Sequence, residues 1–220
     1  MGEMRDPNLD EELALWRAGH HLIAGIDEAG RGAMAGPVVA GAVILPLHIP
    51  AALRRTLAGL RDSKLLTPSQ RDHFFDLIHR TALAVGVGSA SPQVIDTVGI
   101  APAARLAMMG AISRLGRQPD HLLIDAFELP HPPAPQRAII KGDRKCLSIA
   151  AASVIAKVTR DRLMVQLDAA YPDYGLARHK GYVTQAHKLA LHHHGPTPIH
   201  RLSYAPVQAE LARRRIWVRE

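Results

Sequence analysis

The chain has 220 residues, 47% of them hydrophobic, and its 27 Lys and Arg exceed its 20 Asp and Glu, giving a net charge of +7. This length can bury a full core, so one domain with an appendage is expected, and the basic charge favours a polyanionic partner such as nucleic acid or an anionic surface. No apolar run reaches the ~18 residues that span a bilayer and the N-terminus lacks a signal-peptide core, so we expect a soluble, cytoplasmic protein with no membrane partner.

The first part of the chain predicts an arm followed by a hairpin. Residues 1–20 are expected to form an N-terminal arm or short helix, because Leu9, Leu13 and Trp16 have helical spacing. Residues 22–45 contain two β-type runs joined by a Gly-rich turn, and the first run leads into an adjacent pair of carboxylates, Asp27 and Glu28. An acidic pair beside a Gly-rich turn suits a site for a cation and a phosphate.

The turn also matches a different motif. Its sequence from residue 30 to residue 35 has the form G-x-G-x-x-A, the fingerprint of dinucleotide binding. That fingerprint requires a helix next, whereas Gly36-Pro37 breaks one and the following residues are of β type. No acid lies about 20 residues downstream to bind a ribose, since the next is Asp62. We therefore expect no nucleotide cofactor, and the absence of G-x-x-x-x-G-K-[ST] excludes a P-loop.

The rest of the chain mixes strands with helices. Thr67 and Pro68 are typical of a helix start, as N-cap and first helical residue. Leu106 and Val165 are predicted on the buried stripes of their helices. Strands are expected at 82–90, 121–125 and 138–140, and helices at 68–80, 100–115, 146–171, 184–194 and 206–215. The pattern predicts an α/β fold with a mixed central sheet flanked by helices, a core over 21–171 and a C-terminal helical region over 172–220.

Two further groups of residues could take part in catalysis or metal binding, but we interpret both as structural. Cys146 is the only cysteine, which excludes an internal disulfide and a cysteine-based zinc site, and its place in an apolar helical run favours packing over a catalytic role. The run 192–194 is three histidines, but only one of them can face a given direction on a helix. An exposed basic face is the preferred interpretation of that run.

Four acids stand at the ends of predicted elements: Asp27, Glu28, Asp125 and Asp143. If these ends meet, the carboxylates repel, by about 4 kcal/mol for a pair ~4 Å apart at an effective dielectric of ~20. Two divalent cations would balance four negative charges, and oxygen-only ligands favour Mg²⁺ or Mn²⁺ over zinc. Two such ions about 3.5–4 Å apart are a known arrangement for phosphodiester hydrolysis.

Each acid also has a simpler interpretation as a surface or capping residue, and Asp143 could be the N-terminal charge of a helix. Successive residues of a strand face opposite sides of the sheet, so Asp27 and Glu28 share a site only if the strand twists or ends between them. The case for a metal site depends on all four acids together.

The chain resembles ribonuclease HII, the bacterial type 2 ribonuclease H, from about residue 23 to residue 207. The motifs are GIDEAGRG (25–32), AGPVVA (35–40), DSK (62–64), LLID (122–125), KGD (141–143), SIAAASVIAKVTRDR (148–162), HKGY (179–182) and HRLSYAPV (200–207). The resemblance implies the ribonuclease H fold and endonucleolytic hydrolysis of the RNA strand of RNA/DNA hybrids. It also implies cleavage 5′ of a lone ribonucleotide in duplex DNA, leaving 5′-phosphate and 3′-hydroxyl ends.

The resemblance also assigns roles to individual residues. It implies that the four acids are the metal-binding carboxylates, that Tyr182 stacks at the RNA-to-DNA junction and that Lys64 contacts a phosphate. The turn of Gly30, Arg31 and Gly32 is expected to approach the 2′-hydroxyl, the group that separates RNA from DNA. Three further residues are predicted as phosphate contacts by charge alone: Arg178, Lys180 and Arg201.

Some alternatives stay open. Asp161 is a rival for the fourth ligand, although we expect it to pair with a neighbouring Arg instead. Ala126 stands where the family commonly has Gly. A protein of the same fold that binds hybrids without cutting them is the alternative function, and a monomer is the expected state.

Overall fold

The fold is built on the predicted hairpin, whose strands β1 (Ile23–Ala29) and β2 (Val38–Ile44) pair antiparallel. A computed structural model describes residues 6–217 of the protein; residues 1–5 of the expected N-terminal arm, and residues 218–220, lie outside the described part. Around the hairpin a five-stranded sheet forms in the order β3-β2-β1-β4-β5. The outer strands are β3 (Ala84–Ala90), β4 (His121–Asp125) and β5 (Gln136–Ile139).

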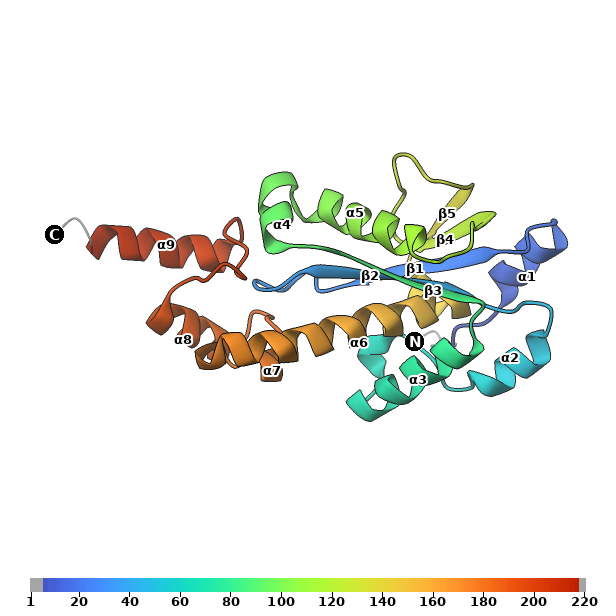
Figure 1. Ribbon diagram of the computed structural model, residues 1–220, viewed down its shortest axis with the longest axis horizontal. Coiled ribbons are helices and arrows are strands. Elements are labelled where there is room, and N and C mark those ends of the chain that lie inside the picture. Colours follow the sequence, from blue (N-terminus) through green and yellow to red (C-terminus); the bar gives the residue numbers. More distant parts are fainter. Residues whose placement is uncertain (1–5, 218–220) are drawn as a thin grey trace, which may run out of the picture.

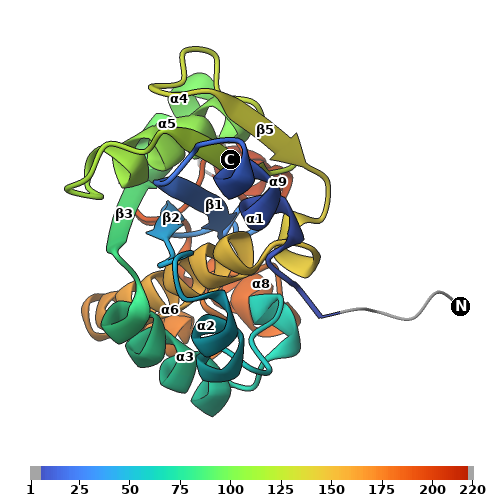
Figure 2. The ribbon, with the colours of Figure 1, turned by 90° about the vertical axis from the view of Figure 1, so that its right-hand side faces the viewer.

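The sheet is mixed, as predicted. β2 and β3 pair antiparallel, whereas β4 pairs parallel with β1 and with β5. Helices cover both faces of the sheet (Figures 1 and 2). One face is covered by α6 (Leu147–Ala170), below which lie α2 (Pro50–Thr56) and α3 (Pro68–Thr81), and the other by α4 (Pro92–Val98) and α5 (Ile100–Ser113).

Glycines in the strands set how closely the helices approach. A Cβ added to Gly25 of β1 would lie 2.2 Å from the backbone of Ser148 in α6. A Cβ added to Gly88 of β3 would lie 2.1 Å from the carbonyl oxygen of Ala107 in α5. Both helices therefore rest directly on the sheet backbone, and alternate strand residues belong to one face or the other.

One residue of each of two predicted stripes is exposed, Leu106 at 55% and Val165 at 48%, so these two predictions are wrong. The other residues of the stripe in α6 are buried. The buried face of α5 is instead formed mostly by small residues, among them Ala103, Ala107 and Ala111, because a large side chain would hold the helix away from the glycines of β3. The predicted start of α3 is confirmed by a capping box between Thr67 and Gln70.

The N-terminal helix α1 (Asp10–Arg17) is part of the core architecture. The buried carboxylate of Glu12 accepts hydrogen bonds from the backbone N–H and the hydroxyl of Ser148, at 2.8 and 2.7 Å, and so caps the start of α6. Cys146, just before α6, is fully buried, and burial raises the pKa of its thiol. The predicted packing role of this cysteine fits its surroundings.

The C-terminal segments extend from one end of the sheet (Figure 1). They comprise α7 (Leu176–His179), which the sequence did not predict, α8 (Gln185–His194) and α9 (Ala205–Trp217). Short 3-10 helices lie at Ser63–Leu65, Gly142–Arg144 and Pro172–Tyr174. No helix in the described part of the chain combines the length and apolarity that a membrane crossing requires.

Candidate active site

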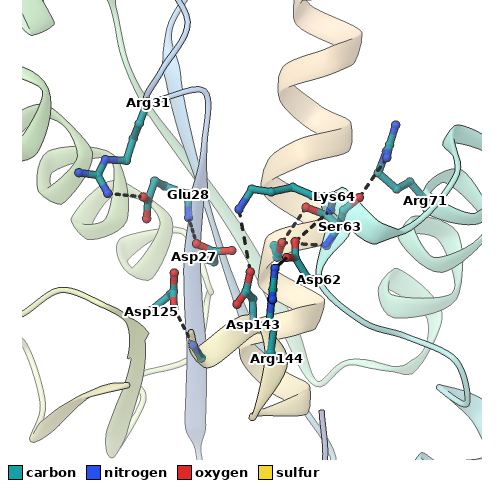
Figure 3. A network of polar contacts seen from close by, with 12 residues as sticks. Asp27, Glu28, Arg31, Asp62, Ser63, Lys64, Arg71, Asp125, Asp143 and Arg144 are labelled. Atoms are coloured by element: carbon teal, nitrogen blue, oxygen red, sulfur yellow. Dashed lines mark hydrogen bonds and ion pairs between the residues drawn. The ribbon is translucent and has the colours of Figure 1, made fainter. Parts of the chain in front are cut away.

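The parallel pairing of β1 with β4 brings two of the predicted acids together. Ile26 pairs with Ile124, so Asp27 and Asp125 follow side by side at the carboxyl ends of neighbouring strands. Asp143, in the short helix before α6, faces them, as Figure 3 shows. Asp125 is fixed by the N–H of Gly142, which donates to its Oδ1 at 2.7 Å. The end of β4 and the start of α6 therefore supply carboxylates to one place.

Glu28 reaches the same place from the other face of the sheet. β1 continues to Ala29, so the strand does not end between Asp27 and Glu28. However, β4 ends at Asp125, so no strand pairs with this edge of β1 beyond Ile26. The side chain of Glu28 pairs with Arg31 at 3.3 Å, and the guanidinium of Arg31 lies 4.5 Å from the ring centre of Phe127. Because this edge of the sheet is open, Asp27 and Glu28 can share a site even though successive strand residues face opposite sides of the sheet.

Burial and mutual repulsion act on all four carboxyl groups. Burial, with the charges of Glu28 and Asp125, raises the pKa of Asp27 well above its usual range. Burial also raises the pKa values of Glu28 and Asp125, despite the opposing effects of Arg31 on the first and of the Gly142 N–H on the second. The pKa of Asp143 rises to about 6, through burial and then through the charges of Asp62 and Asp125. Arg31 and Lys64 thus compensate only part of the negative charge here.

One acid was missed as a site residue. Asp62 is buried; its carboxylate accepts a hydrogen bond from the backbone N–H of Lys64 at 3.0 Å and pairs with Arg144 at 3.3 Å. Burial opposes the charge on Lys64, but Asp62 and the nearby acids outweigh that effect and raise its pKa. The exposed ammonium of Lys64 lies 4.0 Å from Asp143. The spacing of Asp-Ser-Lys, with an acid two residues before the lysine, is the signal that could have identified this positioning role.

The donor set fits a hard divalent cation. All donors are carboxylate oxygens, and Glu28 Oε2 is buried without a hydrogen-bond partner in the described structure. Within residues 6–217 no three His, Cys, Asp or Glu side chains are arranged to hold a metal ion as they now stand. The four acids nevertheless surround one space (Figure 3), and a cation there would relieve the repulsion between them.

A buried arginine holds the turn after β1 in place. The guanidinium of Arg201 is fully buried and donates to the carbonyl oxygens of Gly30, Arg31 and Gly36 at 2.7, 2.8 and 3.1 Å. The prediction that Arg201 contacts a phosphate is therefore wrong, because its guanidinium is fully buried and donates within the protein. Charge is visible in a sequence, whereas burial of that charge depends on the tertiary fold.

The two glycines of this turn differ. Gly30 has a φ of 92°, and a Cβ there would lie 1.9 Å from Arg160 Nε. Gly32 is exposed, and nothing lies within 4 Å of its added Cβ. Gly30 is thus required by the fold, while the backbone at Gly32 is open to an approaching molecule.

Tyr182 and Lys180 lie beside a groove. The ring centre of Tyr182 is 5.2 Å from the ammonium of Lys157 and 5.2 Å from the guanidinium carbon of Arg160. The ammonium of Lys180 donates to the carbonyl oxygen of Ala177. Tyr182, Lys180 and the exposed Arg178 line a groove of about 710 Å³ between α3 and α6.

The remaining candidates lie apart from the four acids. Asp161 pairs with Lys157 at 2.7 Å, so the partner is not the arginine that we expected. The histidines at 192–194 are exposed, and His192 pairs with Glu210 at 3.3 Å, in agreement with an exposed face. Ala126 adopts a φ of 56°, in the left-handed region that favours Gly.

A mixed five-stranded sheet with helices on both faces and acids gathered at one strand edge defines a ribonuclease H-like nuclease. A solved ribonuclease H2 from Pyrococcus horikoshii OT3 has a similar structure, with a TM-score of 0.74 and 28% identity over 88% of this chain and 98% of that one. The family model described as Ribonuclease HII matches residues 24–207. The chain belongs to the ribonuclease HII family and is a hydrolase.

Curated relatives agree with this assignment. A ribonuclease HII from Dehalococcoides mccartyi (strain 195) is 50% identical over 92% of this chain and 95% of its own length. A ribonuclease HII from Roseiflexus castenholzii is 55% identical over 91% of this chain and 89% of its own length. Both relatives therefore match nearly from end to end.

Proposed function

We propose that the protein is an endoribonuclease that hydrolyses the RNA strand of RNA/DNA hybrids, including the bond on the 5′ side of a single ribonucleotide in duplex DNA. The products are 5′-phosphate and 3′-hydroxyl ends. The observation that carries this proposal is the group of four acids at the edge of β1, two of them buried and two partly buried, all with raised pKa values. Membership of the ribonuclease HII family supports the substrate class.

Asp27, Glu28, Asp125 and Asp143 would hold two divalent cations, Mg²⁺ or Mn²⁺. Such ions, when bound, supply an activated water and stabilise the negative charge that develops on the leaving oxygen. The chain's own contribution is to fix the acids on rigid elements. Lys64 extends its exposed ammonium over the acids, where it can attract a phosphate.

Recognition of the substrate is assigned to the turn and to the residues beside the groove. The open backbone at Gly32, next to Gly30 and Arg31, can approach a 2′-hydroxyl without a side chain in the way. Tyr182 supplies an aromatic face for stacking at an RNA-to-DNA junction, with Lys180 next to it. We propose a cytoplasmic monomer, with an arm over 1–20, a catalytic core over 21–171 and a substrate-contacting region over 172–220, that uses no nucleotide cofactor.

The test is cleavage of a DNA duplex that carries one ribonucleotide. Wild-type protein in Mg²⁺ or Mn²⁺ should cut 5′ of the ribonucleotide, and neither EDTA-treated protein nor Asp125→Asn should cut. An all-DNA duplex of the same sequence is the control. Tight binding of the hybrid without cutting in either metal would instead show a binding protein of this fold, the alternative function.

A further inference from the structure

Three distant segments meet beside the turn, and we call their meeting point the junction: residues 33–36, 181–182 and 199–201. The segments are joined by backbone hydrogen bonds. The N–H of Met34 donates to the carbonyl of Gly181 at 2.9 Å, and the N–H of Gly36 to that of Ile199 at 2.8 Å. The N–H of Arg201 donates back to Met34 at 2.9 Å. The loop before α9 is therefore anchored to both predicted substrate-reading elements.

From this loop, Arg201 holds the first of these elements. Three of its N–H groups donate to carbonyl oxygens of the 30–36 turn, and Nη1 also donates to the hydroxyl of Tyr204 at 3.0 Å. Among the described residues, no carboxylate lies within ion-pair distance of this guanidinium. The planar guanidinium thus fixes the shape of the turn, and a lysine ammonium could not form the same set of hydrogen bonds.

The neighbouring His200 holds the second element through another histidine. The N–H of Thr197 donates to Nδ1 of His200 at 3.1 Å, so this nitrogen is an acceptor and Nε2 carries the proton. His200 Nε2 then donates to His187 Nε2 at 3.2 Å, and His187 Nδ1 donates to the carbonyl oxygen of Tyr182 at 3.0 Å. Each hydrogen bond fixes the direction of the next, which leaves one tautomer for each ring.

The chain of bonds requires neutral rings, and both rings are buried. Burial lowers the pKa values of His187 and His200 to about 4. His179 stacks on His187 with ring centres 4.2 Å apart, and the ring of Tyr174 lies 5.1 Å from that of His200. At neutral pH the two histidines therefore act as uncharged, directional connectors.

We propose that His200 and Arg201 are positioning residues that hold the two substrate-reading elements in place without touching the substrate, and that His200 thereby determines which ribonucleotides are cut. Arg201 sets the turn expected to approach the 2′-hydroxyl, and His200, through His187, sets Tyr182, expected to stack at the RNA-to-DNA junction. The inference rests on the proposed function. It implies that the two residues affect different substrates: loss of the His200 connection harms cutting at a lone ribonucleotide, whereas loss of Arg201 harms every ribonucleotide.

The test uses two variants that keep different halves of His200. His200→Asn keeps an acceptor near the Nδ1 position and loses the donor to His187, whereas His200→Gln keeps a donor near the Nε2 position. The readout is kcat/KM on a DNA duplex with one ribonucleotide divided by kcat/KM on a uniform RNA/DNA hybrid. We expect the ratio to fall about tenfold in His200→Asn and to stay within about twofold of wild type in His200→Gln. Arg201→Lys should lower both rates and leave the ratio unchanged.

A merely structural role would give a different result. The proposal is wrong if His200→Asn lowers kcat/KM equally on both duplexes, or if His200→Asn and His200→Gln lower the ratio of the two kcat/KM values equally. Thermal unfolding of each variant measures the folded fraction. The same ratio is also measured as equilibrium binding of the two duplexes in EDTA, which needs no catalysis. Wild-type protein that cuts neither duplex would refute the proposed function, while the binding ratio still decides the role of His200.

Discussion

Two regions of the protein bury charge in opposite ways. The carboxylate site gathers Asp27, Glu28, Asp125 and Asp143, whose pKa values are all raised. The junction instead buries Arg201 and contacts the buried Arg160 of α6, and neither arginine pairs with a carboxylate within residues 6–217. Burial lowers the pKa of Arg160 to about 10. Both regions thus carry unbalanced charge, negative in one and positive in the other.

The difference lies in how each charge is solvated. Arg160 donates to the carbonyl oxygens of Ala35, Pro37 and Lys180 at 2.9 to 3.0 Å, and Arg201 is satisfied in the same manner. Backbone dipoles therefore replace water around the guanidinium groups. The carboxylate site has few such donors, and one buried oxygen of Glu28 has none. A region that satisfies its own charge contributes to folding, whereas one that does not is prepared for a ligand.

The largest expected effect separates activity from stability at the carboxylate site. Asp27→Asn should lower kcat/KM by roughly 10³-fold, because a lost cation ligand removes several kcal/mol of transition-state stabilisation. Its stability in EDTA should be unchanged or higher, because the replaced group is repelled by its neighbours. Steady-state kinetics and urea unfolding measure the two effects. A loss of more than about 1 kcal/mol in stability would show that Asp27 is satisfied within the fold.

The opposite result is expected at the junction. Arg201→Met should lower the free energy of unfolding by about 3 kcal/mol, because three backbone carbonyl groups each lose the hydrogen bond that Arg201 donates. Urea unfolding of Arg178→Met is the control, since Arg178 is exposed and its loss should change stability by at most about 0.5 kcal/mol. Equal effects of the two variants would contradict a structural role for Arg201.

The turn joins the two regions, and substitution of its two glycines should have different effects, one on stability and the other on cleavage. Gly30→Ala should cost about 2 kcal/mol or more in stability, because φ is 92° and the new Cβ would meet Arg160. Gly32→Ala should unfold like wild type but cut a lone ribonucleotide about tenfold more slowly, because its Cβ would stand where the substrate approaches. Unfolding and cleavage measured on both variants test the division, which fails if the two alanines behave alike.

A pH effect should be smaller and should come from the junction. The folded-state pKa values of His187 and His200, about 4, lie below the ordinary value of 6.5. At these two rings the unfolded chain therefore binds more protons between pH 6.5 and pH 4, and their contribution to stability falls as the pH falls through this window. Between pH 7 and pH 5 each ring should contribute a loss of about 2 kcal/mol. Urea unfolding of His200→Gln should show a shallower fall than wild type, and an equal fall would place the titration elsewhere.

Local signals in the sequence were sufficient for much of the fold. The hairpin and the start of α3 followed from turn chemistry and capping, which depend on residues close in the chain. The buried face of α5 did not follow, because it is set by contact of Ala107 with Gly88 of a different element. A hydrophobic stripe through Leu106 was the natural prediction, and only the sheet determines that small residues face inward.

The candidate site shows the same limit. The acids were identified because they stand at the ends of predicted elements, and parallel pairing of β1 with β4 places Asp27 beside Asp125. The burial of Arg201 was not predictable, since an arginine in a basic segment is expected to face solvent or a phosphate. Asp62 was missed as a site residue because its effect on Asp143 depends on tertiary structure, although the nearby Lys64 is a signal within the sequence.

The burial of Cys146 has a practical consequence for measurements on this protein. It is the only thiol in the sequence, it is fully buried beneath α1, and its raised pKa keeps it protonated at neutral pH. A cysteine introduced at an exposed position would therefore react with a maleimide dye against almost no background. A fluorophore at Arg178, beside the groove, would allow single-molecule observation of duplex binding without removal of the native cysteine.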